Sequence, residues 1–489
     1  MVGWAKLNNY SMYPLVERVR RTGEEQRLWS PGDCIIVAVS GGPDSVALLH
    51  ILHAIASRPE QKLSLVCAHI NHGFRPEESL EEAEFVQGLA NKLGLPFELG
   101  NLDIPSYIRQ SGRSTQLAAR EKRYEFLHTV AKKHGAASIA LAHHADDQAE
   151  TVMMRIIRGS GATGLAGMRM RRREHNVNLI RPLLRIYKAE ILQTCQDAGI
   201  PYRIDSSNLQ NKYARNAIRL DVLPFLGQYN EQLAESLNRL ADTLGEEDDY
   251  LQQMTGRAYR ELVTPDGAGL AFQVGPFAAL HAALQRRLIK LILNYLPFGM
   301  EESDFVKIER VRQGVIQSSP TTWSLDLGGG LQCVREYDTI RFIPNAAEGN
   351  DGLRYTYHVN TVPAEVAIQG LGASLLFAQT TAGQDAVSMA HGKDRAVFDA
   401  DKLVYPLTVR SRQPGDMMKV MGLNGTKKVK DIFIDEKIPP SLRSRIPIVT
   451  DGQGRILWIP GIRRSSIAAV GQHTSSVLLM TLVRDAEEQ

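Results

Sequence analysis

The chain has 489 residues, more than a single hydrophobic core usually organises, so we expect roughly two to four domains. Hydrophobic residues make up 43% of the sequence and charged residues 23%, a composition typical of globular proteins. No apolar run reaches the ~18 residues that a helical membrane span requires, which excludes a protein built on such spans. The formal net charge is only +3, but residues 401–464 hold 13 Lys and Arg against 6 Asp and Glu, so this region is a candidate surface for a polyanion.

Four cysteines are spread along the chain: Cys34, Cys67, Cys195 and Cys333. No two of them have the spacing of metal ligands, and a secreted protein of this length usually contains more cysteines. Residues 1–21 also lack the apolar core of a signal peptide. We therefore expect a reducing, cytoplasmic location.

After a short predicted helix at residues 13–21, the first strongly marked element is a strand at residues 35–39. Its apolar, mostly β-branched residues form a continuous run, as expected for a strand covered on both faces. A glycine turn interrupts the run, and residues 46–52 resume with helical spacing. Glycines let the backbone approach an anion, and a helix start presents N–H groups without partners. We therefore predict phosphate binding at the turn residues Ser40, Gly41, Gly42, Pro43, Asp44 and Ser45.

Asp44 adds a carboxylate to this turn, and carboxylate oxygens are ligands that Mg²⁺ prefers. We expect Asp44 to hold Mg²⁺ against the phosphates. The turn is not a Walker A motif, because no Lys precedes its final Ser and its glycine spacing differs. A loop that holds a triphosphate without this Lys indicates a different cleavage of the nucleotide.

A second buried strand is predicted at residues 63–70. It contains His69 and ends in Asn71-His72-Gly73-Phe74-Arg75. Polar residues just past the carboxyl end of a strand lie where open α/β sheets bind ligands. We therefore expect residues 71–75 to lie where this sheet binds a ligand.

Arg120 lies on a long predicted helix at residues 114–134, which follows a helix at 78–93 and a strand at 96–102. Two interpretations of Arg120 remain open. It is either a solvated residue of an amphipathic helix or a charge clamp on phosphate or on a carboxylate substrate.

A fourth strand, at residues 137–142, leads into an acidic helix start. We expect His143 and Asp146 at or before the N-cap of that helix. Asp147 and Glu150 are three residues apart, so on a helix they share one face. The phosphate turn and this segment both follow carboxyl ends of strands and therefore face one crevice, which favours a catalytic role for both acids.

Two alternatives remain open for the same segment. Acidic residues in a first turn are also ordinary helix-capping chemistry. A zinc site built from His143, His144 and an acid lacks a standard ligand pattern.

A strand at residues 179–184 and a helix at 188–198 continue the alternation, which predicts an α/β fold with a doubly wound parallel sheet. Beyond it, four segments have helical patterns (229–245, 246–263, 277–296 and 301–314), and 323–343 reads as a hairpin. A small, mixed α+β part follows. We expect a catalytic domain at 1–217, a helical domain with a closing hairpin at 218–343, a linker and β-leaning segment at 344–399, and a basic domain at 400–489.

Three groups of basic residues are candidate RNA contacts. Arg215 and Asn216 follow the turn-forming segment Asp205–Asn208 and read either as a helix cap or as a surface touching RNA or an adenylate. The arginine run at 169–173 reads equally as a solvated loop or a phosphate contact. The C-terminal group is either a solvated basic face or an RNA footprint with salt-sensitive backbone contacts, and its clustering favours RNA. Its members are Arg410, Arg412, Lys427, Lys428 and Lys430.

These motifs together resemble one family. The turn Ser40–Ser45 is similar to the pyrophosphate loop (PP-loop) of the N-type ATP pyrophosphatases. Within that superfamily the chain closely resembles the tRNA(Ile)-lysidine synthetases. The matching segments are 69–75, with Phe74 where Leu is usual, 142–151, 158–168, 181–184, 205–216, 412–416, 427–428, 435–438 and 458–461.

The resemblance implies a ligase that acts in tRNA processing and joins free L-lysine to C2 of the wobble cytidine in the isoleucine tRNA with a CAU anticodon. ATP adenylates the cytidine first, and the products are lysidine, AMP and pyrophosphate. The expected catalytic residues are Asp44, Asp147, Glu150 and Arg120. ATP is expected at Ser40–Ser45, His69 and His143, Mg²⁺ at Asp44 and Asp147, and RNA at Arg215, Asn216 and the C-terminal basic group.

Several points stay open at the sequence level. Free lysine amine titrates near ~10.4, so a carboxylate must accept its proton, and both Asp44 and Glu150 are candidates. The sequence does not fix the oligomeric state, and a homodimer is retained as an expectation. A tRNA cytidine thiolase would use a similar loop but needs paired cysteines. A nucleotide-regulated RNA-binding protein without catalysis would not require the acidic residues.

Overall fold

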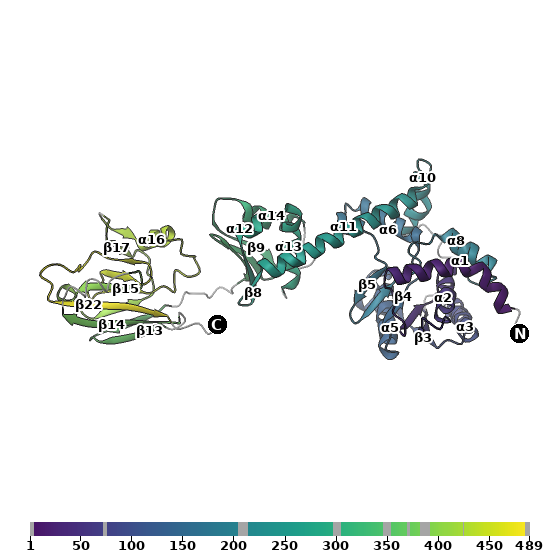
Figure 1. The fold of residues 1–489 in the computed structure, drawn as a ribbon, viewed down its shortest axis with the longest axis horizontal. Helices are drawn as coiled ribbons and strands as arrows, with labels where there is room; N and C mark the ends of the chain where they lie inside the picture. Colours follow the sequence, from purple (N-terminus) through teal and green to yellow (C-terminus); the bar gives the residue numbers. More distant parts are fainter. Residues whose placement is uncertain are drawn as a thin grey trace. The chain divides into compact units, whose positions relative to one another are not determined.

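The computed structural model of the chain describes residues 4–71, 76–203, 214–296, 305–345, 354–368, 372–381, 392–423 and 425–484. The chain divides into two units, Met1–Gln252 and Gln253–Gln489, and the division falls within helix α11 (Leu233–Leu262) (Figure 1). Predicted motif segments at 72–75, 204–213 and 346–353 lie outside the described residues. Among the helices of the described part, none is long and apolar enough to cross a bilayer.

A six-stranded sheet forms the centre of the first unit, in the order β3-β2-β1-β4-β6-β5. Strands β1, β2, β3, β4 and β6 pair in parallel, and β5 pairs antiparallel with β6. The predicted doubly wound parallel sheet is thus confirmed, with one antiparallel edge strand that the alternation did not predict. The strands are β1 (Cys34–Ala38), β2 (Ser64–Asn71), β3 (Phe97–Asn101), β4 (Ser138–Ala140), β5 (Arg171–Glu174) and β6 (Val177–Ile180).

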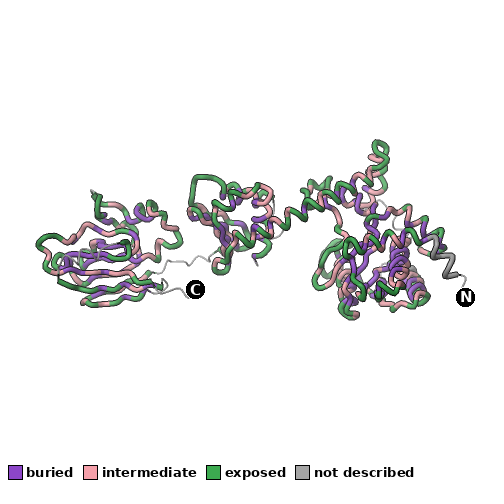
Figure 2. The backbone as a smooth tube through the Cα atoms, viewed as in Figure 1, coloured by how far each residue is buried: buried purple, intermediate pink, exposed green. Residues whose placement is uncertain are grey.

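Helices cover both faces of this sheet, which explains why β1 is apolar throughout. Ile35 and Val37 pack toward α1, α2, α3 and α8, whereas Ile36 packs toward α5. Successive side chains of a strand alternate between faces, so a doubly covered strand has no solvated position. Figure 2 shows the resulting concentration of buried residues around the sheet. The helices are α1 (Trp4–Glu25), α2 (Pro43–Ala56), α3 (Pro76–Lys92), α5 (Thr115–Lys133) and α8 (Lys188–Asp197).

The strand order reverses between β1 and β4, since β2 and β3 lie on one side of this pair and β6 and β5 on the other. In open α/β sheets, ligands bind outside the carboxyl ends of the strands at such a point. The segments leaving these two ends are the glycine turn before α2 and the histidine pair before α6. The remaining helices of this unit are α4 (Ile104–Ser111), α6 (Ala145–Ile157), α7 (Ala162–Leu165), α9 (Ala214–Ala217), a π-helical turn (Ile218–Val222), α10 (Leu223–Gly227) and most of α11.

The second unit begins with a five-stranded antiparallel sheet, β7-β8-β11-β10-β9, packed against three helices around one apolar core. The strands are β7 (Thr264–Asp266), β8 (Gly269–Gln273), β9 (Thr322–Gly328), β10 (Leu331–Glu336) and β11 (Thr339–Pro344). The helices are α12 (Val274–Ala278), α13 (Ala282–Tyr295) and α14 (Phe305–Ile316).

Two predictions for this region were wrong. The two helices predicted at 229–245 and 246–263 are the single helix α11. The break was placed at Gly245, but one glycine costs a helix only about 1 kcal/mol relative to alanine, which the helix-forming residues around it outweigh. The predicted hairpin at 323–343 has three strands, and it pairs with β7 and β8, which are too short to show a periodicity.

The C-terminal part contains two antiparallel sheets that share a core, β12-β16-β19-β20-β21 and β13-β14-β22-β15, together with the pair β17-β18 and, among the described residues, the helix α16. This arrangement confirms the mixed α+β prediction. The elements are β12 (Thr356–Val359), β13 (Ala364–Ile368), β14 (Ala373–Thr381), β15 (Arg395–Asp399), a 3₁₀ turn (Ala400–Lys402), β16 (Leu407–Arg410), β17 (Met417–Met418), β18 (Lys427–Lys428), α16 (Val429–Asp435), β19 (Ile448–Thr450), β20 (Ile456–Ile459), β21 (Arg463–Arg464) and β22 (Ser476–Arg484).

Candidate active site

The glycine turn after β1 is shaped by its own serines. The N–H of Ser40 donates to the hydroxyl of Ser45 at 3.1 Å, and that hydroxyl donates to the carbonyl of Gly42 at 3.0 Å. Gly41 has a φ of +93°, a conformation that a side chain would strain. Gly42 is the N-cap of α2, and the first turn of a helix leaves N–H groups without intrahelical acceptors. The turn is therefore built to receive an anion.

Asp44 lies in the first turn of α2 with one carboxylate oxygen engaged and the other not. Its Oδ2 lies 3.6 Å from Nζ of Lys188 and 3.8 Å from Nε2 of His144. Among the described residues, Oδ1 is buried and has no hydrogen-bond partner. A buried carboxylate oxygen without a partner is costly, and a hard cation such as Mg²⁺ is the ligand it suits.

A cluster of two acids and two arginines closes the other side of the crevice. From α6, Asp147 and Glu150 face Arg215 of α9 and Arg219 of the π-helical turn. Arg215 donates to Glu150 at 2.7 Å and lies 2.9 Å from Oδ1 of Asp147. Arg219 donates to the other oxygen of Glu150 and lies 3.3 Å from the same oxygen of Asp147.

The local sequence accounts for this cluster. The three-residue spacing of Asp147 and Glu150 places both acids on one face of α6, as predicted. Arg215 and Arg219 are four residues apart, the spacing at which helical side chains point the same way. Glu150 is only 1% exposed, and each of its oxygens accepts from one of the two arginines, which compensates for its burial.

Two neighbouring histidines precede α6, and their pKa values shift in opposite directions. For His144, burial alone would lower the pKa, but the hydrogen bond with Asp146 and the charge of Asp147 raise it. For His143, burial, assisted by the positive charge of Arg181, lowers the pKa to about 4. The pKa of His143 therefore lies below its ordinary value, and that of His144 lies above it.

His144, not Asp146, caps α6. The carboxylate of Asp147 accepts from the N–H of His144 at 3.1 Å, while Asp146 lies at the second position of the helix. The prediction that Asp146 lies at or before the N-cap was wrong. Asp146 instead accepts from the N–H of Lys188 at 2.8 Å, which ties the start of α8 to the start of α6.

Charge also lowers the pKa of Asp147. Burial alone would raise it, but His144 and Arg215 lower it. Asp147 therefore stays ionised near neutral pH, the form that a metal ligand requires.

The other residues predicted for this site lie around the crevice. Arg120 is exposed on α5, where its guanidinium stacks over the ring of Tyr124 at 4.9 Å, and its charge helps to lower the pKa of His143. His69 is buried in β2, and its Nδ1 bonds the carbonyl of Val39 at 2.8 Å. Asn216 follows Arg215 within α9.

The C-terminal basic group lies in the other unit, and its members differ. Arg410 forms a 2.7 Å ion pair with Asp416, and Lys427 pairs with Asp435. Lys428 and Lys430 are exposed, and Arg412 is half-buried.

Sequence reasoning missed the roles of Lys188 and His144 and the pairing of Arg219. Lys188 begins α8, the helix that follows β6. The turn after β1 and the start of α6 were selected because they follow carboxyl ends of strands, and the same reasoning could have selected Lys188. These three residues and Glu150 line a cavity of about 290 Å³, together with Asp146, Ala149, Leu223, Pro224, Gly227, Asn230, Glu231, Leu233 and Ala234.

Three family models match this chain. A PP-loop domain matches residues 15–226, a TilS substrate binding domain matches 272–341, and a TilS substrate C-terminal domain matches 407–479. The chain is 36% identical to the tRNA(Ile)-lysidine synthase of Geobacillus kaustophilus (strain HTA426) over 467 residues, which cover 95% of this chain and 98% of the relative.

The chain belongs to the tRNA(Ile)-lysidine synthase family. It is also 37% identical over 437 residues to the tRNA(Ile)-lysidine synthase of Bacillus subtilis (strain 168), covering 89% of this chain and 90% of the relative. The family resemblance and the ligase class predicted from the motifs are thereby confirmed, and the PP-loop match carries the use of ATP.

Two solved structures are also similar to parts of the chain. The crystal structure of a TILS C-terminal domain is 34% identical, covers 27% of this chain and 98% of its own, and has a TM-score of 0.23. The U34-tRNA thiolase NcsA from Methanococcus maripaludis is 18% identical, covers 49% of this chain and 80% of its own, and has a TM-score of 0.41.

Proposed function

We propose that this chain joins free L-lysine to C2 of the wobble cytidine of the CAU-anticodon isoleucine tRNA at the expense of ATP. Family membership over 95% of the chain supports the reaction. The observation that carries the site is Asp44, whose buried Oδ1, at the point where the phosphate turn meets Asp147, has no hydrogen-bond partner among the described residues. This is where a metal-bound triphosphate would need a carboxylate.

In the first step, the turn Ser40–Ser45 receives the outer two phosphoryl groups while O2 of the cytidine attacks the inner one. Preorganised N–H groups of the turn stabilise the charge of the departing pyrophosphate. Mg²⁺ would be held by Asp44 and Asp147, and when bound it neutralises that charge. The cytidine must leave its stack to reach the crevice, as other base-modifying enzymes require.

In the second step, the ε-amine of lysine attacks C2 of the cytidine and AMP leaves. Both oxygens of Glu150 accept from arginines, whereas Oδ1 of Asp44 has no partner in the part of the chain that the structure describes. We therefore favour Asp44 as the carboxylate that orients the amine and receives its proton. Glu150 then acts as a positioning residue that fixes the two arginines, and through them Asp147.

The cavity of about 290 Å³ is our candidate for the lysine site. Its lining carries both signs of charge, with the acids Asp146 and Glu150 and the cations Lys188 and Arg219. Free lysine has one carboxylate and two amino groups, so it requires partners of both signs. Arg120 remains a candidate clamp for phosphate or for the lysine carboxylate.

The second unit would hold the body of the tRNA. Lys428, Lys430 and Arg412 are the candidates for phosphate contact. Arg410 and Arg215 are held in ion pairs with acids of their own unit, so we propose structural roles for these two residues.

Thiolation is not favoured, because three of the four thiols are buried and are therefore poor sulfur carriers. Burial raises the pKa of Cys67 to about 12 and that of Cys195 to about 11, and Cys333 is also buried with a raised pKa. The thiolate is the reactive form, and buried thiols of this kind are inert.

Pyrophosphate release from ATP, measured with the transcribed tRNA and with or without lysine, tests the proposal. We expect release that depends on the tRNA, and AMP release that depends on lysine. Release that requires a sulfur donor and ignores lysine would indicate thiolation. The absence of any release would indicate a binding protein.

A further inference from the structure

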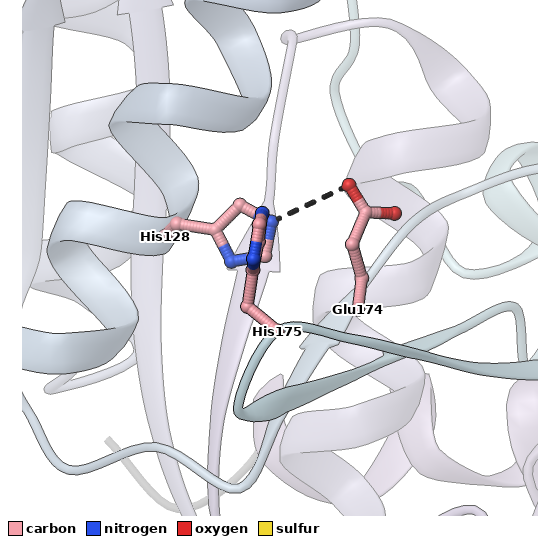
Figure 3. A group of neighbouring side chains, drawn as sticks. All are labelled: His128, Glu174 and His175. Carbon is pink, nitrogen blue, oxygen red and sulfur yellow. Dashed lines mark ion pairs between the residues drawn. The ribbon is translucent and has the colours of Figure 1, made fainter. Parts of the chain in front are cut away.

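A second group of metal-ligating side chains lies outside the crevice (Figure 3). His128 comes from α5, Glu174 is the last residue of β5, and His175 lies in the turn that leads to β6. Each residue offers one potential ligand atom, and these three atoms all lie within 4.8 Å of one another. As Figure 3 shows, the two rings and the carboxylate converge on one point.

The contacts within this group leave a coordination position open. Nε2 of His128 is buried and lacks a hydrogen-bond partner among the described residues, and it lies 3.6 Å from Oε1 of Glu174. The other oxygen of Glu174 is held by Arg172, which directs Oε1 toward the histidines. The rings of His128 and His175 meet edge to face, with centroids 5.1 Å apart.

We infer that His128, Glu174 and His175 bind one divalent transition-metal ion of the zinc class. Two imidazole nitrogens and one carboxylate oxygen form a ligand set that suits Zn²⁺ and is unlike the all-oxygen sets of Mg²⁺ and Ca²⁺. Zn²⁺ ligands lie about 2.0–2.2 Å from the ion, so tetrahedral neighbours are about 3.4 Å apart. The 3.6 Å between Nε2 of His128 and Oε1 of Glu174 is already close to this spacing, and a water molecule would supply the fourth ligand.

This site is separate from the one assigned to Mg²⁺. Strand β6 runs parallel to β4 and β1, and His175 precedes its amino end. Asp44 and Asp147 follow carboxyl ends, at the opposite edge of the same sheet. The ion therefore takes no part in the reaction and has a structural role.

The ion would join two elements that carry basic residues. It fixes the β5-β6 hairpin, with its arginines at 171–173, to α5, the helix of Arg120. Arg171 already donates to the carbonyl of Arg27 at 2.8 Å, so the hairpin would be held at two points. The inference does not depend on the proposed reaction.

The test uses the full chain without a histidine tag, stripped of metal by chelation and then titrated with Zn²⁺ in excess Mg²⁺. Zn²⁺ binding is measured by calorimetry, ligand type by the absorption spectrum of the Co²⁺ form, and stability by thermal melting. We expect one equivalent of Zn²⁺ to bind and to raise the melting temperature.

Two variants remove ligands in different ways. His175 has a φ of +51°, a conformation that glycine adopts freely, so His175→Gly deletes a ligand without straining the turn. His128→Ala deletes the second imidazole. In each variant, Zn²⁺ affinity should fall by more than the ~10- to 100-fold that loss of an outer-shell partner costs, and the gain in melting temperature should vanish.

His134→Ala is the matched control, because His134 follows α5 and bonds Glu98 instead. It should bind Zn²⁺ as the unchanged chain does. Failure of the unchanged chain to bind Zn²⁺, or equal binding by His175→Gly, would overturn the inference. A lysine-ligation assay with ATP and Mg²⁺ reports on the proposed function independently.

Discussion

The crevice and the basic C-terminal region differ in how their charged side chains are paired. In the crevice, Asp147 and Glu150 share two arginines inside a largely closed cluster. In the region 401–464, the positively charged residues include both paired and exposed ones. Arg410 and Lys427 are paired with acids of their own domain, whereas Lys428 and Lys430 are exposed.

The difference teaches that a charge count does not separate binding residues from structural ones. Arg215 and Arg410 were both predicted RNA contacts, yet each is bound to carboxylates of its own unit. A charged residue that is already paired loses its partner when it binds something else, so it is a poor phosphate contact. Exposed lysines have no such cost.

The largest effect is expected in the crevice, from Asp44→Asn. The change keeps the shape of the side chain but removes the charge that we assign to the metal and to the amine. Lysine ligation should fall by about 10²- to 10⁴-fold in kcat. Asp197→Asn, an exposed Asp at the end of α8, is the control. Ligation by Asp44→Asn within a few-fold of the unchanged chain would contradict our assignment.

The second prediction concerns the cluster itself. Glu150→Gln leaves two arginines without their buried acid, which should destabilise the first unit by on the order of 2–4 kcal/mol. The figure is below that for a fully buried pair, because the arginines are about a third exposed. Thermal melting should therefore show a decrease of at least about 4 °C in the first unit. An unchanged melting temperature would mean that the cluster does not stabilise the first unit.

The third prediction tests whether the exposed cations of the basic region bind tRNA while the paired ones do not. The double change Lys428→Ala and Lys430→Ala should weaken tRNA binding and lower the slope of log affinity against log salt by about 2. Arg410→Ala is the matched control and should lower stability while leaving the slope unchanged. If Arg410→Ala alone reduced the slope, the distinction between paired and exposed cations would fail.

The smallest effect is expected from Gly41→Ala. A Cβ at Gly41 would meet only ordinary contacts with Val86 and Phe85, so its cost comes from the φ of +93°. That cost is about 1–2 kcal/mol and should appear as weaker ATP binding with the lysine KM unchanged. Equilibrium binding of ATP measures it, and unchanged affinity would show that the turn tolerates another conformation.

Local patterns predicted much of this molecule, and long-range pairings escaped prediction. The phosphate turn and the shared face of Asp147 and Glu150 follow from spacings of a few residues. The partners of those acids lie 65 to 72 residues further along the chain, and no periodicity links them. Lys188 is likewise brought to Asp44 by the parallel order of the strands.

The errors in the fold have the same origin. Gly245 reads as a helix end locally, yet α11 continues through it because a single glycine is a small penalty. Strands of three to five residues, such as β7 and β8, become strands only by pairing with β11 and with each other. Their sequences alone carry too few alternations to predict them.

The central claim is that this crevice transfers lysine to a cytidine. The most direct test is the mass of the wobble nucleoside after the isoleucine tRNA transcript reacts with ATP and isotope-labelled lysine. We expect a nucleoside that carries one labelled lysine in place of the cytidine oxygen. An unmodified cytidine, or a modified one without the label, would contradict the account.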